Sequence, residues 1–220
     1  MKPQLTKLIA SASCLAGLAA LLAILPLSFS YPIIPYLKFD LAEIPVFLAF
    51  LLMGPEAGAI SSIVYWLVLL LVGSYTPLGP TMRFAATGST LLGLWLGFKL
   101  LGSPRGGLVL GSLLGCLIRV VVMTSFNYLV LLYMFPDLFS FAAASISAFL
   151  RISFPSEAAA FTAVMIFTAV FNILHIPLSI VPAYLIIRSI AGIKGGRQRI
   201  GGIWYAEIVR AASRRSPQRS

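Results

Sequence analysis

Three short stretches of the chain place amide, imidazole or charged side chains next to aromatic rings: residues 36–40, 126–128 and 171–175. Asn172 and His175 are three positions apart, so on a helix they project from the same face. Amides can match the hydrogen-bonding edge of a flat heterocycle while aromatic rings cover its faces. The three stretches therefore predict a site for a flat, polar small molecule.

The first stretch is the most informative, because it packs two aromatics, a cation and an anion into five residues directly before an apolar segment. A Lys38–Asp40 pair with flanking rings could clamp a ligand, although a loop anchored at the membrane interface is an alternative. A lone Asn in lipid often joins two helices, and Arg119 could be structural or functional. The candidate ligand-binding residues are Lys38, Phe39, Asp40, Asn127, Tyr128, Asn172 and His175.

Motifs for other chemistry are missing from the sequence. It has no G-x-x-x-x-G-K-[ST] phosphate loop, so we expect no ATP hydrolysis by this chain. It also lacks H-E-x-x-H, G-x-S-x-G and any acidic cluster suited to Mg²⁺. We therefore expect a binding protein that is not an enzyme, with no metal site and no resident cofactor. Cys14 and Cys116 both lie in apolar runs and are interpreted as small packing residues.

These residues must be positioned by membrane helices. Of the 220 residues, 60% are hydrophobic and only 10% are charged, and soluble domains carry about 25% charged residues. A span needs about 20 apolar residues, so the uncharged runs locate the helices of an all-α membrane protein. With the charge distribution and the polar residues at the outer helix ends, they predict a six-transmembrane-helix bundle with an outward-facing ligand pocket. The expected helices cover residues 8–25, 40–53, 57–72, 82–101, 108–135 and 156–188.

The charge distribution sets the expected orientation. Eight of the sixteen basic residues follow Ile187, and such a tail fits the positive-inside tendency and anionic cytoplasmic lipid better than it fits DNA. A seventh span at residues 138–150 would move this tail outside, so we interpret that segment as interfacial or as a lid. The expected division is a membrane domain at 1–193 and a basic cytoplasmic tail at 194–220, with both termini cytoplasmic. A signal peptide is a less favoured interpretation of the N-terminal run.

The first expected helix also carries small residues at four-residue spacing, Ala12, Ala16 and Ala20. A stripe of small residues allows another helix to approach closely. The spacing does not say whether that helix belongs to this chain or to another protein.

Taken together, the motifs resemble the substrate-binding S components of energy-coupling factor (ECF) transporters, in particular the riboflavin type. The resemblance lies in Tyr36 to Pro45 with Gly54 to Gly58, in Arg119 to Tyr128, and in Phe171 to Leu174. It covers about residues 8–190. His175 stands where such proteins usually have Lys, so an S component for another vitamin or precursor remains open, as does a non-transport membrane scaffold.

The resemblance implies that an outward pocket holds riboflavin and that the chain works with a membrane T component and two ABC-type ATPases. It implies that Ala12, Ala16 and Ala20 dock the T component. Asn127, Asn172 and His175 would bond the ligand's ring edge or ribityl hydroxyls, Lys38 and Asp40 would order the loop, and Phe39 and Tyr128 would cover the ring. The expected location is the cell membrane.

Overall fold

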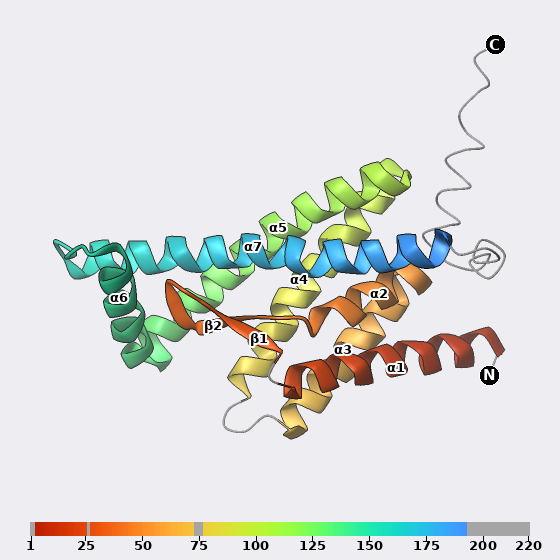
Figure 1. The fold of residues 1–220 in the computed structure, drawn as a ribbon, viewed down its shortest axis with the longest axis horizontal. Helices are drawn as coiled ribbons and strands as arrows, with labels where there is room; N and C mark the ends of the chain where they lie inside the picture. Colours follow the sequence, from red (N-terminus) through yellow and green to blue (C-terminus); the bar gives the residue numbers. More distant parts are fainter. Residues whose placement is uncertain (1–2, 26, 73–76, 193–220) are drawn as a thin grey trace, which may run out of the picture.

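The computed structural model describes residues 3–25, 27–72 and 77–192. The basic tail expected at 194–220 lies outside these residues. The described part is a bundle of helices with one small hairpin (Figure 1). In chain order the elements are α1 Pro3–Ile24, β1 Ser28–Tyr31, β2 Ile34–Asp40, α2 Glu43–Met53, α3 Pro55–Val72, α4 Leu78–Leu101, α5 Pro104–Leu129, the π-helical turn η1 Val130–Met134, α6 Pro136–Leu150 and α7 Glu157–Gly192.

Four of these helices are long and apolar enough to cross a bilayer: α3, α4, the continuous segment from Arg105 to Met134, and α7. The apolar parts of α1, α2 and α6 are shorter. The all-α membrane class is thus confirmed, whereas the count of six spans stays a prediction.

Glycine and proline set several boundaries. Helices α2 and α4 end at Gly54 (φ 99°) and Gly102 (φ 56°), whose positive φ angles are rarely adopted by residues with a Cβ. Pro104 and Pro136 stand in the first turns of α5 and α6, where a missing backbone N–H costs no helical hydrogen bond. These local signals explain why long apolar runs break into separate helices.

One segment differs from the sequence-based prediction. The expected loop before the second helix contains an antiparallel hairpin in which Phe29 pairs with Phe39 and Ser30 with Lys38. Strand β2 runs through Asp40, so α2 begins at Glu43, and Asp40 accepts a hydrogen bond from the Ala42 amide at 3.1 Å. The segment at 138–150 is a helix, α6.

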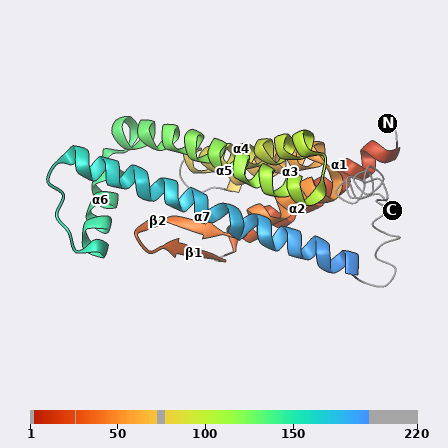
Figure 2. The same ribbon diagram turned by 90° about the horizontal axis from the view of Figure 1, so that it is seen from above.

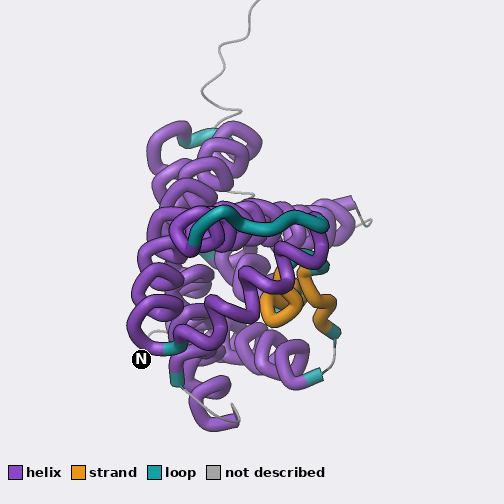
Figure 3. Tube along the Cα trace, turned by 90° about the vertical axis from the view of Figure 1, so that its left-hand side faces the viewer, coloured by secondary structure: helices purple, strands orange, loops and turns teal. Residues whose placement is uncertain are grey.

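The hairpin and α6 gather at one end of the bundle. Helix α6 lies crosswise to α7, and the hairpin lies beside α7 between α6 and α2 (Figures 1 and 2). Seen from that end, the loop between α6 and α7 crosses in front of the helices with the strands to one side (Figure 3). Aromatic side chains fill this end, among them Tyr31, Phe39, Phe139 and Phe171.

The other end has a separate apolar core built from α1, α2, α3, α4 and α7. Phe47, Phe50, Tyr65, Leu94 and Ile180 are almost completely buried there. Residues of the aromatic end, among them Leu131 and Phe171, also line a cavity whose floor carries polar side chains.

Candidate ligand-binding site

The cavity has a volume of about 390 Å³ and is bounded by β2, α2, α4, α5, η1, α6 and α7. This volume falls within the roughly 300–1,000 Å³ typical of small-molecule sites. Most of the lining is apolar, including Met82, Met123, Leu131 and Phe171. The polar groups are few and converge from different elements, as expected of a site that orients a ligand.

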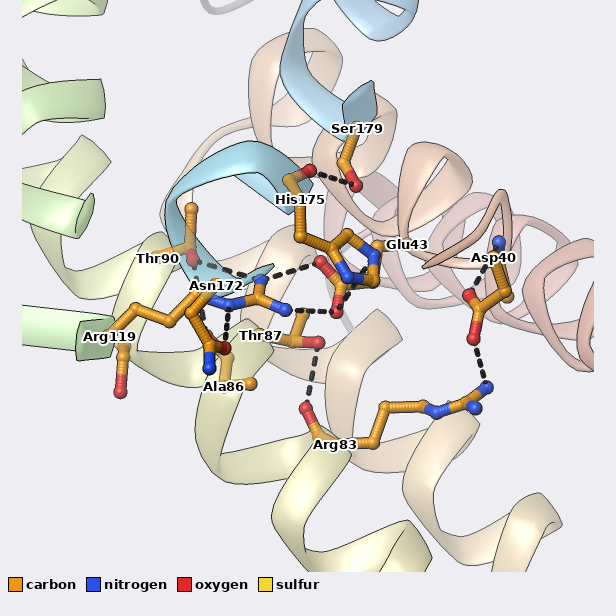
Figure 4. Close-up of polar contacts among 12 residues, drawn as sticks. Asp40, Glu43, Arg83, Ala86, Thr87, Thr90, Arg119, Asn172, His175 and Ser179 are labelled. Carbon is orange, nitrogen blue, oxygen red and sulfur yellow. Dashed lines mark hydrogen bonds and ion pairs between the residues drawn. The ribbon is translucent and has the colours of Figure 1, made fainter. Parts of the chain in front are cut away.

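A buried ion pair lies at the floor (Figure 4). Arg119 of α5 donates to both carboxylate oxygens of Glu43 on α2, with N···O distances of 2.8 and 3.1 Å. The two side chains are 3% and 1% exposed. Because buried charges are costly unless paired and fully hydrogen-bonded, this bidentate geometry is what permits both residues to be buried.

The same guanidinium extends the network to two more helices. Its Nε donates to Asn172 Oδ1 on α7 at 3.2 Å, and its Nη1 makes a longer contact of 3.5 Å with Thr90 Oγ1 on α4. His175 places Nε2 3.9 Å from Glu43 Oε1, too far for a hydrogen bond. Both ring nitrogens of His175 are buried and have no hydrogen-bond partner within the described chain, so they remain available to a ligand in the cavity.

A second ion pair connects the hairpin to α4. Asp40 Oδ2 lies 2.7 Å from Arg83 Nη1, and the same nitrogen donates to the hydroxyl of Tyr65 on α3 at 2.9 Å. Asp40 is buried, whereas the Arg83 side chain is one third exposed. The pair fixes the end of β2 against the wall of the cavity.

Asn127, Lys38 and Tyr36 complete the polar lining. Asn127 is buried, and its amide forms no hydrogen bond among the described residues. Lys38 is exposed on β2. Burial raises the pKa of Tyr36 to about 12, so its phenol is neutral at ordinary pH. The His175 ring and the Asn127 amide thus line the cavity without a hydrogen-bond partner in the described part of the chain.

Comparison with known proteins identifies the family. Residues 7–187 match the model for the substrate-specific component of ECF transporters. The chain belongs to this family. It is therefore an S component, a substrate-binding part of a transporter, and with its apolar helices it is a multi-pass membrane protein.

Individual proteins similar to this chain include riboflavin transporters and a solved S component. The chain is 31% identical over 140 residues to the riboflavin transporter RibU of Staphylococcus aureus, covering 63% of this chain and 72% of that protein. It is 34% identical over 124 residues to the riboflavin transporter FmnP of Bacillus subtilis, covering 54% of this chain and 64% of the relative. A solved S component of a bacterial ECF transporter superposes with a TM-score of 0.63 at 26% identity, covering 84% of this chain and 96% of the solved one.

In this S component, five of the seven candidate ligand-binding residues line the cavity: Lys38, Asp40, Asn127, Asn172 and His175. Phe39 and Tyr128 are not among the lining residues. Phe39 is buried behind the wall, with its ring centroid 4.6 Å from that of Phe171. Tyr128 is 45% exposed and its ring meets Phe161 edge-on. Phe171, next to Asn172 in the chain, is one of three aromatic residues that line the cavity among the described residues, with Tyr36 and Phe135.

The alanine stripe faces inward. Ala12 and Ala16 are fully buried and Ala20 is 4% exposed. Ala12 packs with Ala49 and Ala57, the latter two on α2 and α3. In this conformation the stripe serves packing within the S component, and its docking role stays a prediction.

The candidate ligand-binding residues did not include Glu43 and Arg83, which line the cavity, or Tyr65, whose hydroxyl accepts from Arg83 behind it. The sequence contained a signal for Glu43, because this residue follows Asp40 by three positions and begins an otherwise apolar helix. A charge at membrane depth usually faces a cavity or a partner, and Arg119 inside its own apolar run is the complementary half. Their pairing across 76 positions is visible only in the structure.

Proposed function

We propose that this S component binds riboflavin on the outer side of the cell membrane and delivers it to an ECF importer. The observation that carries the proposal is the mainly apolar cavity into which β2, α5 and α7 bring polar groups, with both ring nitrogens of His175 lacking a hydrogen-bond partner among the described residues. The two relatives named as riboflavin transporters support the choice of ligand.

In this proposal only a few side chains of the cavity contact the ligand. Asn127, Asn172 and His175 bond the edge of the ring or the ribityl hydroxyls, and Phe171 with Met123 covers its faces. Lys38 and Asp40 hold the hairpin against the bound ligand, Asp40 through Arg83. Phe39 acts from behind by supporting the ring of Phe171.

Transport requires an energy source outside this chain, since the sequence has no phosphate-binding loop. We propose that a membrane T component and two ABC-type ATPases supply it, and that both termini and the tail at 194–220 are cytoplasmic. The excess of basic residues in that tail supports this orientation.

Purified protein tests the ligand directly. We expect it to be yellow, to release flavin on denaturation, and to quench riboflavin fluorescence on titration with the ligand-free form. Another vitamin released in place of flavin would replace riboflavin within the same role. Absence of any released or titratable ligand, combined with loss of thermal stability in Asn127→Ala, would support a scaffold instead.

A matched pair of variants localises the site. Asn127→Ala removes an amide that lines the cavity, and Ser112→Ala removes a hydroxyl on the same helix that bonds only its own helix at Leu108. Losing one hydrogen bond is worth about 0.5–1.5 kcal/mol, so we expect about three- to tenfold weaker binding for Asn127→Ala. Equal affinities of the two variants would remove Asn127 from the site.

A further inference from the structure

Arg119 has almost no donor left for a ligand, although it lines the cavity. A guanidinium has five N–H donors, and four of them point at Glu43 twice, at Asn172 and at Thr90. Any effect of Arg119 on a ligand therefore passes mainly through the groups it holds.

The first of these groups is the amide of Asn172. Arg119 can only donate, so the amide oxygen must face it, and the Thr168 carbonyl can only accept, so the amide nitrogen must face that carbonyl, at 2.9 Å. The orientation of the amide is fixed from both sides. The second N–H of Asn172 is then the donor that remains for the cavity.

The second group is the carboxylate of Glu43. Both of its oxygens accept from Arg119. The only carboxylate on the cavity floor is thus neutralised among the described residues, and the other lining carboxylate, Asp40, is occupied by Arg83 and the Ala42 amide. The acceptors that would attract a donor-rich ligand are already satisfied.

We propose that Arg119 is a positioning residue that makes the cavity floor a hydrogen-bond donor surface, selecting ligands whose buried edge carries acceptors such as carbonyl oxygens and ring nitrogens. This inference rests on the proposed riboflavin function. It assigns a specificity role to a residue that has only one N–H donor left for a ligand.

The decisive variants separate the charge of Arg119 from its contact with Asn172. Arg119→Lys keeps a cation for Glu43 but loses the Nε–H donor to the amide. Asn172→Ala removes the amide. Riboflavin affinity is measured for each variant, for the double variant and for Ser112→Ala as a control on the same helix, with melting temperatures recorded in parallel.

We expect Arg119→Lys and Asn172→Ala each to weaken riboflavin binding by about tenfold, the effect of one hydrogen bond lost or misdirected. The double variant should bind no more weakly than Asn172→Ala alone, because Arg119 acts through that amide. A purely structural role would instead multiply the two losses, to about a hundredfold, and would overturn the proposal.

A second variant tests the donor character even if Arg119→Lys folds poorly. Asn172→Asp keeps an acceptor for Arg119 but presents only acceptors, so we expect binding at least as weak as that of Asn172→Ala. Because its second oxygen faces the Thr168 carbonyl, the melting temperature should also fall, and binding is measured below it. Binding equal to the unsubstituted protein would overturn the inference alone. No riboflavin binding by the unsubstituted protein would overturn the proposed function and this inference with it.

Discussion

Helix α5 makes two contacts of opposite kinds. One face packs against α4 through glycines, so closely that a Cβ on Gly97 would lie 2.2 Å from the backbone nitrogen of Gly111. The other face directs Arg119 into the polar network with α2 and α7. The first contact is held by backbone proximity and the second by charge and hydrogen bonds.

The difference shows how a membrane protein can hold a polar site steady. Lipid gives no hydrophobic drive for helices to associate, so close packing of small residues and interhelical hydrogen bonds take its place. The glycine contact fixes α5 against α4. With the helix fixed, Arg119 reaches Glu43 with the bidentate geometry that a buried pair requires.

The largest expected effect comes from the glycine face. Gly97→Ala places a methyl group within the backbone of α5, so the two helices must separate along their length. We expect a loss in the free energy of unfolding of at least about 3 kcal/mol, the upper end for overpacked cores, seen as a lower melting temperature.

Gly88→Ala is the matched control on the same helix, because a Cβ there meets nothing within 4 Å. Alanine is the better helix former by about 1 kcal/mol, so this variant should melt at the same temperature or slightly higher. Equal destabilisation by the two substitutions would show that the glycine spacing does not hold α4 against α5.

Substitutions in the polar contact of α5 should affect stability in a different way. Glu43→Met leaves the Arg119 cation buried without its partner, and breaking a buried pair costs about 3–5 kcal/mol. The double variant Glu43→Met with Arg119→Met removes both charges and should recover most of the melting temperature.

Ligand affinity separates these two variants further. The double variant still leaves Asn172 without its donor, so riboflavin binding should stay weak after stability has returned. Recovery of stability and affinity together would mean that the network serves the fold alone.

Much of the scaffold could be predicted from sequence, and the site less so. Uncharged runs located the long helices, and Asn127, Asn172 and His175 were recognised as polar groups at membrane depth. The sequence did not predict the hairpin, because Pro32 and Pro35 indicate a loop. In the structure Pro35 lies within β2 with its side chain exposed. The Arg119–Glu43 pair joins helices far apart in the chain, and no local pattern encodes which distant charge is the partner.

A smaller effect is expected from the pair that connects the hairpin with α4. Asp40→Asn removes the charge that faces Arg83, but Arg83 is one third exposed, so the loss should fall between about 1 kcal/mol for a surface pair and the 3–5 kcal/mol of a buried one. Riboflavin should dissociate faster, as followed by fluorescence recovery after dilution. An unchanged dissociation rate would show that the hairpin does not restrain the ligand.

The smallest effect concerns Tyr36, on the same strand as Asp40. Its pKa is raised to about 12 by burial, above the usual value near 10, so the neutral phenol is favoured in the folded protein. The stability that this contributes is complete below about pH 10 and is lost as the pH rises toward 12. Tyr36→Phe cannot ionise, so its melting temperature in detergent should fall less steeply over that range than that of the unsubstituted protein. If the melting temperatures of the two proteins fell in parallel with rising pH, Tyr36 would be hydrated in the folded state. The hairpin would then cover the cavity only loosely, unlike the close contact between α4 and α5.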